Sequence, residues 1–278
     1  MNKLRTFLSL LGVMVGIFVI SSIFAVVDSM EDDLLESFSM LDDDVLFVSK
    51  WPWSMGGDYP WWKYVQRREP SLRDSEELAE RLTQASDVAF QMKGMFNLEA
   101  SENAYPNVPV AAVSHTYPGV ISLDLASGRF FNGSESASGS PVAIVGYDIA
   151  MNLFGSQEVL GQKLKIGGKR VEIIGTFTHE GESMISNGFD EFVMVPATFA
   201  PRIFDTRNTE GNSIMVKALP GVEMGVLKDE IIQQLRSVRR VRPANENDFS
   251  INQIEMLTSI ISTIFTQVEL GGWFIAIF

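Results

Sequence analysis

The sequence predicts an α+β domain that is anchored to a membrane. Three observations lead to this fold class: an uncharged apolar stretch near the N-terminus, a middle region of short strand-like runs cut by Gly, Pro and Ser, and a strand–helix order that precedes this region and occurs again after it. Together they predict a discontinuous strand–helix–strand lobe with an inserted, mainly β lobe, flanked by transmembrane helices.

Composition limits the classes of protein that remain. The 278 residues suffice for one large domain or two small ones, and 46% hydrophobic with 21% charged residues is typical of a globular core. The net charge of −13 disfavours nucleic-acid binding, because an acidic chain repels the phosphate backbone. The absence of Cys excludes disulfides, thiol catalysis and thiolate metal sites.

Residues 1–27 are predicted to form a first transmembrane helix. Phe7–Val27 carries no charge, and its 21 residues at about 1.5 Å each match the ~30 Å hydrocarbon core of a bilayer. A cleaved signal peptide is the alternative, but its apolar region would be shorter, about 7–15 residues, and Phe24–Asp28 is a poor cleavage site. An uncleaved span is therefore favoured.

Charges on either side orient this span. Lys3 and Arg5 precede it, and four acidic residues follow it closely: Asp28, Glu31, Asp32 and Asp33. Because positive charge is retained in the cytoplasm, the N-terminus is predicted to be cytoplasmic. The bulk of the chain would then lie on the periplasmic side of a bacterial inner (cytoplasmic) membrane.

Residues 28–105 are predicted to form a stalk helix and the first half of the α/β lobe. Apolar residues from Met30 to Leu41 recur at helical spacing, so the first helix should continue out of the membrane to about Asp44. The acids between them indicate a solvated helix face rather than a cation site, since metal ligands must converge in space. Strands are predicted at 44–49 and 85–99, with a helix at 71–84 between them.

The segment 51–65, WPWSMGGDYPWWKYV, holds four Trp and two Tyr. Its Gly and Pro residues predict a loop. Such an aromatic loop either packs against a domain edge, anchors at a membrane interface or grips a ligand, and packing is favoured.

Residues 106–210 form the predicted inserted lobe. Five short runs rich in β-branched residues predict strands, namely PVAAVS, PVAIVG, KLKIGG, RVEIIGTF and EFVMVP. One helix is predicted at 147–154, ending at Gly155 as its C-terminal glycine. SESASGS at 134–140 is predicted to be a flexible surface loop, and Gly167-Gly168 a hairpin turn.

Residues 211–248 complete the α/β lobe, with a strand at 213–218 and an amphipathic helix from Val222 to Val238. Residues 249–269 are predicted to form a second stalk helix, for which Ser250 and Gln253 provide a capping box. The final nine residues, 270–278, would cover only ~13 Å as a helix, under half of the hydrocarbon core. They are predicted to begin a second transmembrane helix of a longer protein.

No catalytic, cofactor-binding or metal-binding residue is predicted. The two His residues, His115 and His179, lie 64 positions apart and lack a metal-binding spacing. The sequence contains no GxSxG motif, and Gly167–Arg170 lacks the full spacing of a phosphate-binding loop.

The candidate functional residues are instead helix-packing glycines. Gly12 and Gly16 form a GxxxG motif inside the first span, where small residues let a second helix approach closely. Gly271 and Gly272 open the second apolar stretch.

Several stretches in collinear order resemble permease subunits of the MacB/FtsX type in ABC transporters. They are NKLRTFLSLLGVMVG at 2–16, GRFF at 128–131, PVAIVG at 141–146, NLFG at 152–155, LGQKLKIGGKRVEIIGTF at 160–177, DEFVMVP at 190–196 and DFSI at 248–251. The resemblance covers nearly the whole chain apart from the aromatic segment 51–65. It implies a MacB-like periplasmic core domain, in which a porter-like lobe encloses an inserted β lobe, followed by further spans.

The resemblance also implies a function. The chain would be a non-catalytic permease subunit that couples cytoplasmic ATP hydrolysis to periplasmic movement for export or efflux. An ABC-type ATPase, on a separate chain or a fused domain, would bind ATP and Mg²⁺. The implied partners also include a second permease copy or paralogue, the lipid membrane, a periplasmic adaptor and an outer-membrane channel, but no nucleic acid. The alternative is a membrane-anchored periplasmic ligand-binding or sensor domain without transport.

Overall fold

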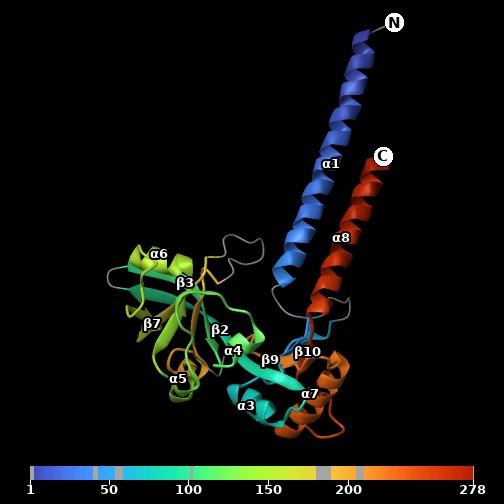
Figure 1. The fold of residues 1–278 in the computed structure, drawn as a ribbon. Helices are drawn as coiled ribbons and strands as arrows, with labels where there is room; N and C mark the ends of the chain where they lie inside the picture. The colour runs from blue at the N-terminus through green and yellow to red at the C-terminus, as the bar shows by residue number, and fades with distance from the viewer. Residues whose placement is uncertain are drawn as a thin grey trace.

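Two long helices stand on a mixed α/β domain (Figure 1). The computed structural model describes residues 3–39, 43–53, 59–100, 103–179, 189–204 and 210–277. Helix α1, Lys3–Ser39, and helix α8, Ile254–Ile277, run antiparallel and side by side, so both ends of the described chain lie at the far end of this pair. The predicted continuation of the first span into a stalk is confirmed, because α1 is one helix of 37 residues.

The domain is built on one ten-stranded sheet. Its order is β10-β1-β9-β2-β3-β8-β5-β7-β4, with β6 paired to β2 and β7. The strands are β1 Val45–Ser49, β2 Ala85–Ala100, β3 Asn103–Val113, β4 Leu125–Gly128, β5 Val142–Val145, β6 Lys163–Ile166, β7 Lys169–Phe177, β8 Val193–Pro196, β9 Ser213–Ala218 and β10 Ser250–Asn252. Most neighbours are antiparallel, whereas β3 with β8 and β5 with β7 are parallel.

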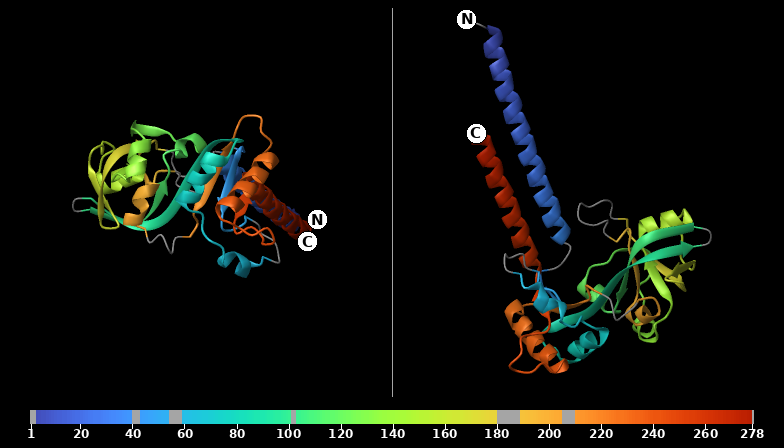
Figure 2. Two further views of the ribbon diagram at one scale, coloured as in Figure 1. Left: turned by 90° about the horizontal axis from the view of Figure 1, so that it is seen from below. Right: turned by 180° about the vertical axis from the view of Figure 1, so that it is seen from behind.

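Strand β2 belongs to two lobes. Its first half, from Ala85 to Gln91, pairs with β9, and its second half, from Gln91 to Ala100, pairs with β3. We call the part around β10, β1, β9 and the first half of β2 the stalk-side lobe. The remaining strands form the distal lobe, which projects sideways from the stalk-side lobe, whereas the helix pair rises above it (Figure 2).

The stalk-side lobe is discontinuous in sequence, as predicted. Helices α3, Leu72–Arg81, and α7, Met224–Val238, pack on each other and on one face of its sheet. Alternate strand residues such as Leu46 and Val48 point to these helices, while Val45 and Phe47 point to the other face. That second face is covered by the short helix α4, Tyr117–Val120, and by the start of α8.

Three short helices belong to the distal lobe, namely α5 Gly133–Ser138, α6 Tyr147–Phe154 and the 3₁₀ helix η1 Ala197–Arg202. Two of them, α6 and η1, pack on its strands. Helix α6 ends at Gly155 with φ +68°, which confirms the predicted C-terminal glycine. The predicted hairpin turn is confirmed as well, since Gly167 and Gly168 both have positive φ between the paired residues Ile166 and Lys169.

Three local predictions were wrong. SESASGS is not a loop: Asn132 and Glu135 form a capping box, and Gly139 closes α5 in the left-handed conformation. Ser250 does not cap α8, because it pairs with Ser49 in the sheet as part of β10. The aromatic segment is not all loop either, since its last five residues form helix α2, Trp61–Val65.

Candidate functional site: the helix pair, its base and the interlobe cleft

The helix pair contains the predicted packing glycines. Gly272 of α8 faces α1, where a Cβ atom on this glycine would lie 2.9 Å from Cζ of Phe24. Gly12 and Gly16 lie higher on α1, where an added Cβ would meet no described atom within 4 Å. Gly271 is part of α8, but its surroundings lie outside the described part of the chain. Of the four candidates, the structure therefore places Gly272 against the neighbouring helix.

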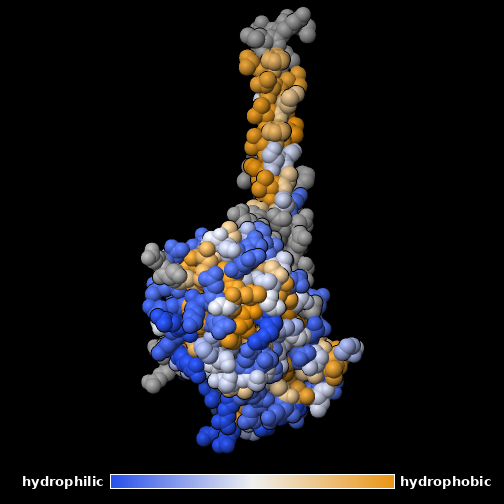
Figure 3. All heavy atoms as spheres, turned by 60° about the vertical axis from the view of Figure 1, so that its left-hand side comes forward, coloured by the Kyte–Doolittle hydropathy of each residue, from blue (hydrophilic) through white to orange (hydrophobic). Residues whose placement is uncertain are grey.

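The surface of α1 fits a lipid environment. The 22-residue stretch Leu10–Glu31 is long and apolar enough to cross a bilayer, and none of its most apolar window is buried in the protein. Figure 3 shows hydrophobic side chains along this helix and a mostly hydrophilic domain surface beneath it. On α8, the apolar helical stretch Ile254–Val268 is shorter.

The lower ends of the two helices are joined through neighbouring strands. Strand β1 follows α1 in the chain, β10 leads directly into α8, and the two strands pair antiparallel from Phe47↔Asn252 to Ser49↔Ser250. Asn252 is fully buried at this junction. Its Oδ1 accepts from the Trp53 amide at 2.9 Å, and its Nδ2 donates to Ser49 Oγ at 2.8 Å and to the Trp51 carbonyl at 3.1 Å. Asn252 thus links the segment that follows β1 to the strand that leads into α8.

The loop before α3 is attached to the same junction. Arg67 donates to Ser250 Oγ at 2.7 Å and to the Lys50 carbonyl at 3.3 Å, and it lies over the Tyr64 ring at 4.5 Å. Part of the aromatic segment therefore packs, as favoured from the sequence, through Tyr64, Trp51 and Trp53. Trp61 and Trp62 are instead 58% and 57% exposed.

A buried arginine ties this loop to the second half of the lobe. The Arg239 side chain is 0% exposed and lies 2.9 Å from Asp74 Oδ2 and 3.4 Å from Asp248 Oδ2. Asp74 also completes the capping box of α3 with Ser71. Since 165 residues separate Arg239 from Asp74, no local sequence signal identifies this pair.

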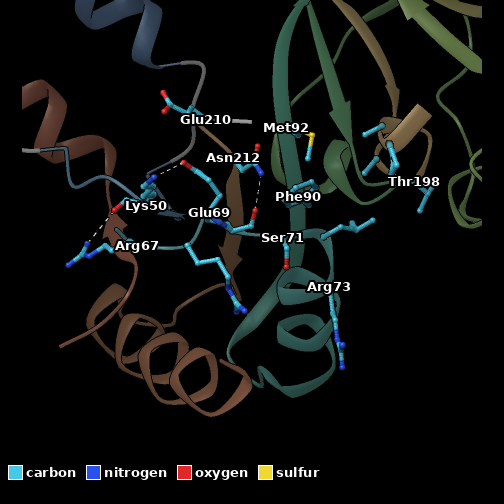
Figure 4. Close-up of a pocket in the computed structure, with 16 residues that line it drawn as sticks. Lys50, Arg67, Glu69, Ser71, Arg73, Phe90, Met92, Thr198, Glu210 and Asn212 are labelled. Atoms are coloured by element: carbon cyan, nitrogen blue, oxygen red, sulfur yellow. Dashed lines mark hydrogen bonds and ion pairs between the residues drawn. The ribbon is translucent and has the colours of Figure 1, made fainter. Parts of the chain in front are cut away.

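A cleft of about 1020 Å³ separates the two lobes. One wall comes from the loop before α3 and the start of that helix, the opposite wall from η1, and Phe90 and Met92 of β2 lie between them (Figure 4). Figure 4 places Lys50, Glu69 and Glu210 toward one end and Thr198 at the other. Sequence reasoning missed this cleft, because its walls come from three distant segments that only the sheet brings together.

Lys50 and Glu69 form the innermost ionic pair of the cleft wall. Their side chains are 12% and 17% exposed, and Nζ lies 3.8 Å from Oε1, which is longer than a hydrogen bond. Both Glu69 carboxylate oxygens are buried. Burial raises the pKa of Glu69, and Lys50 together with the backbone amides of Asn212 and Gly211 opposes this rise only in part.

The two histidines lie in different surroundings. His179 Nδ1 lies 3.0 Å from Asp190 Oδ2, and its ring stacks on Tyr147 at 4.2 Å, beside a small cavity of about 160 Å³. His115 lies beside Gly133 instead. Within the described ranges, no group of three His, Asp or Glu side chains is placed to hold a metal ion.

Comparison with known proteins identifies the family. The MacB-like periplasmic core domain family matches residues 6–234. The chain belongs to this family. The predicted MacB/FtsX-type resemblance is thereby confirmed, and with it a MacB-like periplasmic core domain.

Curated relatives carry the same domain within longer chains. The chain is 24% identical over 263 residues to the macrolide export ATP-binding/permease protein MacB of Marinobacter nauticus, covering 94% of this chain and 38% of that protein. It is 25% identical over 215 residues to the pyoverdine export ATP-binding/permease protein PvdT of Pseudomonas entomophila, covering 75% and 31%. The chain thus spans about a third of the length of these MacB-like relatives.

Solved structures agree on the fold. The periplasmic region of MacB from Actinobacillus actinomycetemcomitans superposes with a TM-score of 0.64 at 14% identity, covering 82% of this chain and 97% of that one. The extracellular domain of the noncanonic ABC-type transporter YknZ from Gram-positive bacteria gives 0.57 at 18% identity, covering 74% and 98%. The MacB-like fold and the N-terminal apolar helix together support anchoring in the inner membrane.

Proposed function

We propose that this chain transmits movement from the membrane-spanning part of an ABC exporter to its periplasmic domain. The observation that supports this most is the pairing of β1 with β10 at the base of α1 and α8. A helix of 37 residues is about 55 Å long at 1.5 Å per residue, so a tilt at its membrane end displaces its base. The paired strands then convey that displacement into one continuous sheet.

The coupling requires an element with two arrangements that both ends bias. The helix pair and the stalk-side lobe supply such an element. Their contacts at Gly272, Asn252 and Arg67 tie the helices, the strands and the cleft wall together. We further propose the division into a stalk-side half at 28–105, an inserted lobe at 106–210 and a second half at 211–248.

The partners follow from this role. ATP and Mg²⁺ would be bound and hydrolysed by an ABC-type ATPase, and the relatives named ATP-binding/permease proteins support either a fused or a separate ATPase part. A second permease copy or paralogue would pack beside the first span, with Gly12 and Gly16 at the contact. A periplasmic adaptor and an outer-membrane channel would extend the route out of the cell.

The direction and membrane arrangement are part of the same proposal. The chain would serve export, as the names of the macrolide and pyoverdine exporters suggest. Its N-terminus would be cytoplasmic, and residues 270–278 would begin a second span within a multi-pass protein. The chain itself would contribute no catalytic residue.

Two experiments test the proposal. The full-length protein is isolated by affinity from native membranes, where we expect an ABC-type ATPase to be recovered with it. Spin labels on α8 and on η1 then report their distance in nanodiscs with and without ATP and an ATPase inhibitor such as vanadate. A distance that changes with nucleotide supports transmission, whereas an unchanged distance and recovery without any ATPase would overturn it.

The interlobe cleft favours a second candidate, a periplasmic ligand-binding or sensor domain without transport. The coding sequence after Phe278 separates the two functions. Three further apolar stretches support the permease, and a soluble signalling domain supports the sensor.

A further inference from the structure

We propose that the interlobe cleft binds an amphiphilic anion, with its acidic group at Lys50 and its apolar body between the start of α3 and η1. The proposal concerns binding alone and does not depend on transport. The cavity of about 1020 Å³ is at the upper end of the range for small-molecule sites, roughly 300–1,000 Å³. Its position between two lobes is also where ligand sites occur preferentially.

The apolar part of the site lies between the walls. Phe90 and Met92 are both largely buried, at 1% and 7% exposure, and they belong to the part of β2 where the strand changes partner. Leu72 faces them from the start of α3, with Ala200 and Pro201 on the opposite wall.

The polar part of the site favours an anion. Lys50 Nζ lies 3.8 Å from Glu69 Oε1, so its donors are available to a third group at true hydrogen-bond distance. Both Glu69 oxygens are inaccessible behind it, which prevents a ligand cation from reaching them in this arrangement. Among the charged residues that line the cleft, four are basic and two acidic: Lys50, Arg67, Arg68 and Arg73 against Glu69 and Glu210.

The two outer arginines strengthen this preference at the rim. Arg68 and Arg73 are 60% and 85% exposed and hold their acidic partners only at 3.4 and 3.6 Å. Arg67 is committed elsewhere, because it donates to Ser250 Oγ next to α8. Lys50 directly follows β1, and β1 pairs with β10, the strand that leads into α8. A ligand held at Lys50 would thus lie next to the base of α8.

The test uses two matched probes, 2-naphthoate and 2-naphthylmethylammonium, with the full-length protein in lipid nanodiscs. Binding is measured by calorimetry and by saturation-transfer NMR, with empty nanodiscs subtracted. We expect naphthoate to bind at least tenfold more tightly than the ammonium probe. Absence of naphthoate binding, or preference for the cation, overturns the proposal.

Variants locate the probe. Lys50→Met with Glu69→Gln removes the ammonium without leaving an unpaired carboxylate, and should weaken naphthoate binding at least tenfold. Lys165→Met with Glu99→Gln is the matched control, because this exposed ion pair at 2.6 Å does not line the cleft. Pro201→Trp and Leu72→Trp fill the cleft from opposite walls, so that one informative variant remains if the other fails to fold. Naphthoate binding that survives either folded cleft-filling variant, or falls equally in the control, overturns the site.

Discussion

Phe24 of α1 and Gly272 of α8 meet where the two long helices run side by side: a Cβ atom on Gly272 would lie 2.9 Å from Phe24 Cζ and 3.0 Å from Cε1. The glycine thus lets the ring of one helix approach the backbone of the other. Helices in direct contact have axes about 8–10 Å apart, and a larger residue at such a point increases that distance.

We predict that Gly272→Leu separates the two helices by about 1–2 Å, since the new side chain must displace the Phe24 ring. Because the chain has no Cys, spin labels can be attached at Met30→Cys and Thr266→Cys without further substitutions. Both positions are exposed and lie six residues from the contact on their helices. Val268→Leu is the control, because Val268 lies on the same helix as Gly272 and is 49% exposed. Equal distances in both variants would contradict the contact.

Asn252→Leu should destabilise the junction beneath the helices. The substitution leaves the Trp53 amide without its side-chain acceptor, whereas the Trp51 carbonyl still accepts from Ser49 Oγ at 2.8 Å. A buried polar group left unpaired costs about 1–3 kcal/mol. The free energy of unfolding in urea measures the loss. Asn245→Ala, at an exposed position nearby, should change it by less than about 0.5 kcal/mol. A loss as small as that of the control would show that Asn252 does not hold the junction.

Arg239→Met should lower the free energy of unfolding by about 3–5 kcal/mol, because it leaves the buried Asp74 carboxylate with only the exposed Arg68, at 3.4 Å, as a cationic partner. Adding Asp74→Asn should recover part of the loss, since asparagine removes the unpaired charge and still caps α3. Arg73→Met provides the surface control, with an 85% exposed side chain. If the double variant were less stable than Arg239→Met, the charge argument would fail.

Lowering the pH should remove the contribution of the Arg129–Glu135 pair to the stability of the fold. Two hydrogen bonds of 2.7 Å from Arg129 lower the pKa of Glu135 from 4.5 to about 2, against the opposing effect of burial. A carboxyl whose pKa is depressed on folding stabilises the protein above its unfolded pKa and loses this contribution as pH falls. The unfolding midpoint should therefore fall less in Glu135→Gln than in the wild type between about pH 4.5 and 2.

Glu99→Gln provides the control for this pH series, because Glu99 is 53% exposed and its ion pair with Lys165 lies at the surface. Its acid profile should follow the wild type. Parallel profiles for Glu135→Gln and the wild type would contradict the assigned role of Arg129.

Local patterns were sufficient for most elements. Apolar and β-branched residues alternate or cluster in the runs that form β5 and β7, as is typical of strands. Helix α6 ends at Gly155, as its sequence predicts. The loop prediction for 134–140 was wrong because it relied on the Ser and Gly composition and did not use the capping box that begins at Asn132. The prediction that Ser250 caps α8 was wrong because Ser250 pairs with Ser49 in the sheet.

The site was less predictable, because its contacts join distant parts of the chain. Asn252 meets Trp53 across 199 residues, and Arg67 meets Ser250 across 183. A single Asn before an apolar helix has no distinctive local pattern. Gly272 was identified because a glycine in an apolar helix is itself a signal for close packing, whereas its partner Phe24 was not.

The sharing of β2 also bears on how the two lobes are oriented. An inserted domain commonly hangs on a pair of linkers, and its angle then depends on side-chain contacts at the interface. Here one crossing point is Gln91, inside a strand of 16 residues that is hydrogen-bonded on both sides of it. On that side, the angle between the lobes is therefore set by the twist of the β2 backbone along its length. The right-handed twist of a strand arises from the sterics of L-amino acids. A change of pitch in this one strand would swing the distal lobe as a whole.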